Sequence, residues 1–217
     1  MERFAPLAFK LAVYAWLTVF FDQAATSFYT DRIAARWPAM LMLFRAWTFL
    51  PIHEAGHFLF MLFGRTIMLI GGSFWQIAFP LLWFLIALRQ RSHVAPFPLF
   101  WVGENMMDVS LYMRDAVYRY LPLLGGRPSH HDWYQLFTMW GTMDSAETFA
   151  DLMYYPGFVI SAGAIAAGVF LAFRSAFRPQ PAAALPVPPA PRPLAPEEVP
   201  RPEDDLSGFG NDQPPSS

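Results

Sequence analysis

The chain has 217 residues, of which 55% are hydrophobic and 15% charged, and its net charge is −2 at pH 7. Soluble domains ordinarily have about 45–50% apolar and about 25% charged residues. The composition therefore excludes an ordinary soluble enzyme, and the balanced charge excludes the basic surface that binds nucleic acid. Because there is no cysteine, disulfides, thiolate metal sites and a cysteine nucleophile are excluded as well. Any metal ion must be held by His, Asp or Glu.

Five apolar segments each approach the about 20 residues with which a helix crosses about 30 Å of hydrocarbon. They are residues 5–25, 39–63, 66–88, 94–113 and 153–173. The first could instead be a signal sequence, but it lacks a short basic leader and a clean cleavage site, so a retained anchor is favoured. We therefore predict an all-α, multi-pass integral membrane protein with about five transmembrane helices, in which residues 1–178 form the membrane domain.

Two regions are too polar or too low in complexity to join that domain's apolar core. Residues 114–152 carry enough charge to predict an extramembrane loop, with a helix near 144–152. Residues 179–217 hold more than half of the 21 prolines and an acidic end, which predicts a disordered tail whose partner the sequence does not name. The distribution of arginines favours a cytoplasmic tail in a bacterial-type inner membrane.

The second apolar segment contains charged side chains that such a setting disfavours. Arg45 and Glu54 would each cost about 2.5–3.5 kcal/mol at the centre of a membrane helix. Charged groups persist there when they face a protein interior or a watery cavity, and they then mark function. The segment is therefore the first place to look for a site.

The same segment contains the sequence His53-Glu54-Ala55-Gly56-His57. Two histidines four residues apart project from one face of a helix, so their imidazoles can take adjacent corners of a zinc tetrahedron. Glu54 follows the first histidine, which places its carboxylate beside the open position of the metal, where it can act on water. The pattern predicts Zn²⁺ held by His53 and His57, with Glu54 as the catalytic base.

A catalytic zinc site usually has a third protein ligand. The fourth apolar segment supplies Asp108, which we favour, and the alternatives are His131, Glu104 and Asp132. Asn105 is a candidate catalytic residue, because its side-chain amide could donate to the scissile carbonyl or its oxyanion. A hydrogen bond between helices is the other interpretation of Asn105.

Small and polar residues interrupt the third apolar segment at Gly71-Gly72-Ser73 and at Gln76. One interpretation is the start of a helix that packs closely against a neighbour. The other is an irregular, strand-like edge beside the site, which a membrane tolerates only where protein or water covers it.

The His-Glu-x-Gly-His sequence inside a membrane segment resembles the site-2 protease family of intramembrane zinc metalloproteases. The resemblance implies a core of three membrane helices, the first carrying the histidines and the glutamate and the third an aspartate ligand, here within Asn105-Met106-Met107-Asp108. It also implies hydrolysis of peptide bonds in membrane proteins or peptides within the bilayer. The chain departs from the family pattern, since no proline follows Asn105 at the family's spacing and no Asp-Gly pair occurs on this segment.

Two other functions compete with a peptidase. One is another membrane metalloenzyme such as a di-iron desaturase, but by resemblance those sites use more histidines than the five in this chain. The other is an inactive membrane scaffold with a structural zinc site. Glu54 distinguishes an active enzyme from a scaffold, because a structural zinc site needs its ligands and no additional base.

Overall fold

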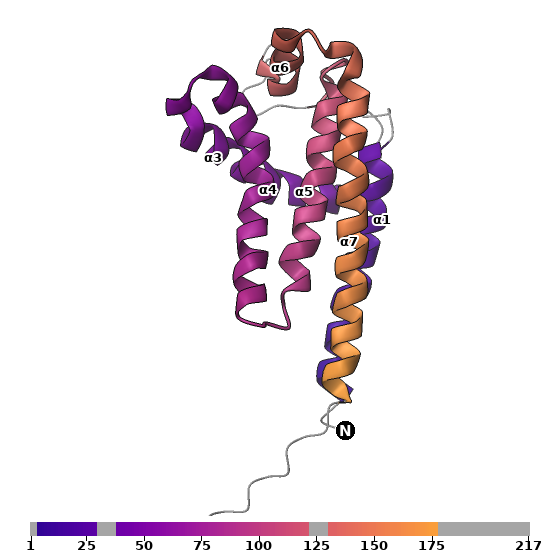
Figure 1. Ribbon diagram of the computed structural model, residues 1–217. Coiled ribbons are helices and arrows are strands. Elements are labelled where there is room, and N and C mark those ends of the chain that lie inside the picture. The colour runs from indigo at the N-terminus through magenta and orange to yellow at the C-terminus, as the bar shows by residue number, and fades with distance from the viewer. Residues whose placement is uncertain (1–3, 30–37, 122–129, 178–217) are drawn as a thin grey trace, which may run out of the picture. The chain divides into compact units, whose positions relative to one another are not determined.

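The computed structural model describes residues 4–29, 38–121 and 130–177, all within the unit Met1–Arg178. Every regular element in these ranges is a helix, which confirms the all-α class (Figure 1). Residues 179–217, for which we predict a disordered tail, lie outside the described residues.

Three helices are long and apolar enough to cross a membrane. They are α1 (Phe4–Tyr29), α4 (Arg65–Arg89) and α7 (Ala146–Ala176). With a rise of 1.5 Å per residue they are about 38 to 47 Å long, more than the about 30 Å of a hydrocarbon core. The fifth predicted segment and the helix expected near 144–152 are both parts of α7. The structure therefore supports a membrane protein, and three candidate spans rather than five.

The second predicted segment is not one helix. It consists of α2 (Ala39–Phe44), a π-helical turn η1 (Arg45–Phe49), α3 (Leu50–Phe60) and a 3₁₀ turn η2 (Met61–Phe63). The fourth segment is a single helix, α5 (Pro96–Asp115), but most of its side chains are buried, including several polar ones. Neither segment is among the three candidate spans.

Helices α3 and α4 pack with almost no space between their backbones. A Cβ atom at Gly56 would collide with the carbonyl oxygen of Gly71 and lie 2.8 Å from Cβ of Trp75. Gly71 lies inside α4, which begins at Arg65, so the expected close packing is confirmed, whereas a helix start at this position and the strand-like edge are both wrong. Because α4 lies so near, its buried Gln76 side chain reaches His53 on α3, with 3.0 Å between Oε1 of Gln76 and Nδ1 of His53.

Helix α5 lies among α1, α4 and α7 and carries much of the core. Phe100, Met107 and Leu111 are buried in it. The hydroxyl of Ser161 on α7 donates to the carbonyl oxygen of Phe100 at 3.3 Å. This packing fixes α5 and, with it, the polar face that turns towards α3.

A short helix, α6 (Asp132–Trp140), lies within the predicted 114–152 loop and is followed by a 3₁₀ turn, η4 (Met143–Ser145). The Trp133 indole N–H donates to Ser73 Oγ at 3.0 Å, which attaches α6 to α4. In Figure 1, α3 and α6 lie at the end of the bundle opposite the connection between α4 and α5. The predicted loop thus contains a helix, α6, that lies at the same end of the bundle as α3, the helix that carries the two histidines.

Candidate metal centre

The two histidines of α3 face α4 from successive turns of one helix. Their ring centroids are 4.8 Å apart. Gly72 on α4 lies directly against them, because a Cβ atom there would be 2.6 Å from Nε2 of His53 and 2.7 Å from Nε2 of His57. A glycine at this position therefore keeps free the space in front of both Nε2 atoms.

Hydrogen bonds on the other ring nitrogens determine which nitrogen carries the proton. Nδ1 of His57 lies 2.8 Å from the carbonyl oxygen of Met68, which can only accept, so Nδ1 of His57 donates. Nδ1 of His53 lies 3.0 Å from Oε1 of Gln76. The Gln76 amide nitrogen donates to Asp108 Oδ2 at 2.8 Å, which leaves its oxygen to accept from His53. In the neutral rings both Nε2 atoms therefore present lone pairs.

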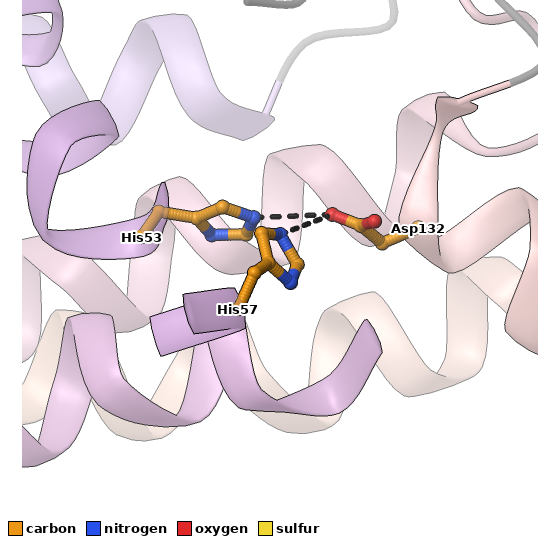
Figure 2. A group of neighbouring side chains, drawn as sticks. All are labelled: His53, His57 and Asp132. Atoms are coloured by element: carbon orange, nitrogen blue, oxygen red, sulfur yellow. Dashed lines mark hydrogen bonds and ion pairs between the residues drawn. The ribbon is translucent and has the colours of Figure 1, made fainter. Parts of the chain in front are cut away.

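Asp132 meets these two lone pairs from the start of α6. Its Oδ2 atom is 3.1 Å from Nε2 of His53 and 3.1 Å from Nε2 of His57 (Figure 2). One possible ligand atom from each of the three residues lies within 4.8 Å of the others. The group could therefore hold a metal ion.

Several contacts hold Asp132 in this place. The Tyr112 hydroxyl donates to Asp132 Oδ2 at 3.1 Å and accepts the backbone N–H of Asp132 at 3.0 Å. His131 caps α6, since its Nδ1 accepts from the backbone N–H of Tyr134 at 3.2 Å. Burial alone would raise the pKa of Asp132, but the two imidazoles, when protonated, donate to the carboxylate and place positive charge beside it, which outweighs burial and lowers the pKa below its ordinary range. The carboxylate is thus an anion at neutral pH.

Asp108 lies on the same cavity but has different partners. Nε of Arg45 donates to Asp108 Oδ1 at 2.6 Å, and the amide of Gln76 donates to Oδ2. Arg45, Asp108 and Gln76 thus form a buried chain that ends at Nδ1 of His53. The structure brings Asp132, and not Asp108, into the group with the histidines.

The remaining predicted residues lie in different places. Glu54 is exposed and lines the cavity. Asn105 is buried and donates to the carbonyl oxygen of Trp101 on its own helix, at 2.7 Å. Glu104 is buried, and His131 Nε2 lies 3.3 Å from Asp115 Oδ2. The structure does not bring Glu104, Asn105 or His131 to the lining of the cavity.

The cavity has a volume of about 180 Å³, and most of its lining is polar or charged. Its lining residues are Arg45, Leu50, His53, Glu54, His57, Gln76, Asp108, Tyr112, His130 and Asp132. They come from α3, α4, α5 and the start of α6, together with the π-helical turn. The site is therefore assembled from four separate parts of the chain.

The sequence alone does not predict Tyr112 as part of the site, and it predicts Gly72 beside the site only in the strand-like interpretation, although both residues lie against its central atoms. Tyr112 follows Asp108 by one helical turn, so a polar stripe along α5 was an available signal. A glycine opposite a pair of histidines has no local signal, because its role is the space that it leaves.

The comparisons with known proteins add no assignment to this geometry. No protein-family model, no curated protein and no solved structure matches the chain.

Proposed function

We propose that this protein is a membrane-embedded zinc metallopeptidase, in which His53, His57 and Asp132 hold the metal ion and Glu54 is the general base. The observation that carries the proposal is the convergence of three anionic or lone-pair-bearing atoms on one point of a polar cavity. In this proposal α1, α4 and α7 anchor the protein in the bilayer as a multi-pass protein.

A carboxylate and two lone pairs repel one another unless a cation lies between them. Protons are one way to remove the repulsion: burial lowers the pKa of His57, but the Asp132 carboxylate raises it to about 9, so without a metal ion His57 carries a proton at neutral pH. A second proton, on His53, would place two imidazolium ions with ring centroids 4.8 Å apart against a single carboxylate. One divalent metal ion uses all three atoms as ligands and keeps both rings neutral. The hydrogen bonds on the two Nδ1 atoms are those that usually orient metal-bound histidines.

The donor set fits zinc. Two imidazole nitrogens and one carboxylate oxygen are the ligands of many catalytic zinc sites, which keep a fourth position open. Ligands about 2.0–2.2 Å from a tetrahedral zinc ion lie about 3.4 Å from one another. Both N–O distances in the group are 3.1 Å, close to that edge length.

The chemistry that zinc supplies in such a site is Lewis acidity towards a carbonyl oxygen and a water molecule. Glu54 follows the first ligand and is exposed to the same cavity, so its carboxylate can accept a proton from the attacking water. It then delivers that proton to the leaving amine. Arg45 keeps a positive charge at the cavity wall, and it balances Asp108 there.

The substrate in this proposal is a membrane-associated protein or peptide. The cavity is small, which favours an extended segment over an intact helix. A helical substrate must unwind locally, because its amides are otherwise held in hydrogen bonds to the carbonyl groups four residues earlier. Peptide-bond hydrolysis rests on the His-Glu-x-Gly-His resemblance together with this geometry.

Metal analysis of the purified protein in detergent tests the proposal. We expect about one zinc ion per chain, loss of zinc in His57→Ala, and full zinc content in Glu54→Gln. Incubation with a library of hydrophobic peptides, read by mass spectrometry, should show cleavage by the wild type and none by Glu54→Gln. A wild type without zinc would overturn the metal centre. Zinc with equal cleavage by both proteins would overturn the role of Glu54, and zinc without any cleavage would favour a structural site.

A further inference from the structure

We propose that a groove at the opposite end of the bundle binds a phospholipid with an anionic headgroup, whose phosphate lies at Lys10. The groove has a volume of about 530 Å³ and lies between α1 and α7 on one side and the α4–α5 connection on the other. It shares no lining residue with the cavity beside α3. The inference therefore stands or fails independently of the proposed metal centre.

The walls of the groove suit an acyl chain. Aromatic and aliphatic side chains from four helices line it, among them Phe9, Leu17, Trp83, Phe97 and Leu171. Binding pockets for small molecules have volumes of about 300–1,000 Å³, mostly apolar walls and a few polar groups at defined places. The volume of the groove lies in this range, and its walls are likewise mostly apolar with a few polar groups.

The polar side chains of the groove carry no negative charge. They are Lys10, Tyr14, Gln90, Ser92 and His93, and none of the residues that line the groove is acidic. Lys10 donates one hydrogen bond, at 2.9 Å, to the hydroxyl of Ser175. An ammonium group has three N–H donors, and among the described residues no carboxylate forms an ion pair with Lys10. Its charge is available to an anion.

The position of Lys10 explains why a lipid phosphate is the anion. Lys10 is half-buried near one end of the apolar stretch Pro6–Phe28, where a cation without an anionic partner is costly. Arg89 and Arg174 lie in the last turns of α4 and α7, at the same end of the bundle as the groove. Basic residues at the ends of membrane helices lie at the level of the headgroups, and basic pockets between such helices bind anionic lipids. A free phosphate ion would leave the apolar walls of the groove unoccupied.

Native mass spectrometry of the full chain in detergent tests the inference. The probes are phosphatidylglycerol and phosphatidylcholine with identical acyl chains, each added at the same concentration. We expect one phosphatidylglycerol per chain, bound at least about fivefold more tightly than phosphatidylcholine. That factor corresponds to about 1 kcal/mol for one basic residue near a lipid phosphate.

Five variants locate the lipid. Lys10→Gln should abolish the preference for phosphatidylglycerol, and Lys10→Arg should restore it, while Arg65→Gln, an exposed position at the other end of α4 and outside the groove lining, should leave it unchanged. Ala87→Phe fills the groove and should lower the binding of both lipids, whereas Leu85→Phe, on the same helix outside the lining, should not. Far-UV circular dichroism and the elution volume in detergent report whether each variant is folded.

Three results would overturn the inference. Equal binding of the two lipids by the wild type would show an unselective apolar surface. Equal effects of Lys10→Gln and Arg65→Gln would show a general effect of charge. A dimer without bound lipid, separated by Ala87→Phe, would show that a second copy of the chain occupies the groove.

Discussion

The cavity beside α3 has two halves, and each contains a buried carboxylate. In the histidine half, Asp132 faces the Nε2 atoms of His53 and His57 at 3.1 Å. In the arginine half, Asp108 accepts from Arg45 at 2.6 Å and from the amide of Gln76 at 2.8 Å. Asp108 is thus paired with donors of the chain itself, whereas Asp132 faces two groups that are acceptors when neutral.

This difference separates a ligand from a residue that positions a ligand. A carboxylate that faces a guanidinium and an amide has its charge balanced and its oxygens occupied, so it orients Gln76 and, through Gln76, the ring of His53. A carboxylate that faces two imidazole lone pairs needs a cation. The two halves therefore predict different losses when each carboxylate is removed.

The largest effect is expected from the histidine half. Asp132→Asn keeps the shape of the side chain and removes its charge, so zinc affinity should fall at least about 100-fold. Proteins bind structural zinc with a free energy of about 10–16 kcal/mol, and about four ligands share that free energy. Competition with a zinc-binding dye in detergent measures the loss.

Asp144→Asn is the matched control, because Asp144 is exposed and lies outside the cavity lining. It should bind zinc as tightly as the wild type. If Asp132→Asn also retained full affinity, and Asp108→Asn lost it, the ligand would be Asp108, as the sequence alone favours.

A smaller effect is expected when the space before the histidines is filled. In Gly72→Ala the new Cβ would lie 2.6 Å from Nε2 of His53 and 2.7 Å from Nε2 of His57, so α3 and α4 must separate or the rings must turn. Strain of about 1–3 kcal/mol, as in other overpacked interiors, would weaken zinc binding about 5-fold to 150-fold. The same dye competition measures it.

Gly163→Ala is the control for this change, since a Cβ atom at Gly163 in α7 has no neighbour within 4 Å. It should leave zinc affinity unchanged. Equal zinc affinity in both alanine variants would mean that the space at Gly72 has no part in metal binding.

The sequence predicted those parts of the fold and the site that depend on local spacing. His53 and His57 lie on one face because they are one turn apart in a helix, and that relation holds wherever the helix lies. The long apolar segments at 66–88 and 153–173 lie within α4 and α7 because runs of that composition favour helices of membrane-crossing length.

The parts of the fold and the site that the sequence did not predict depend on contacts between distant parts of the chain. Asp132 reaches the histidines because α6 attaches to α4 through Trp133 and to α5 through Tyr112, and no local pattern around residue 132 encodes either contact. Composition also could not reveal that residues 39–63 are divided by a π-helical turn. The polar side chains of α5 are satisfied or covered by neighbouring helices, so its apolar content alone overstated its likeness to a lipid-facing span.

The smallest effect is expected from the arginine half, where the change acts through another residue. Asp108→Asn removes the charge that balances Arg45 and gives Gln76 a partner that can either donate or accept. The Gln76 amide can then turn its N–H groups towards Nδ1 of His53, which would lose its acceptor. Loss of such an outer partner typically weakens metal binding 10-fold to 100-fold, and we expect about 10-fold, since His57 and Asp132 keep their own contacts.

Glu104→Gln is the matched control, because it replaces another buried carboxyl group by an amide one turn earlier on α5, outside the cavity lining. Its zinc affinity should equal that of the wild type. If Asp108→Asn lost as much affinity as Asp132→Asn, both carboxylates would be ligands and the two halves would be one site. If it lost none, the orientation of His53 would not depend on Asp108. Helix packing, together with the hydrogen bond that His57 donates to the carbonyl oxygen of Met68, would then suffice to hold the two rings in place.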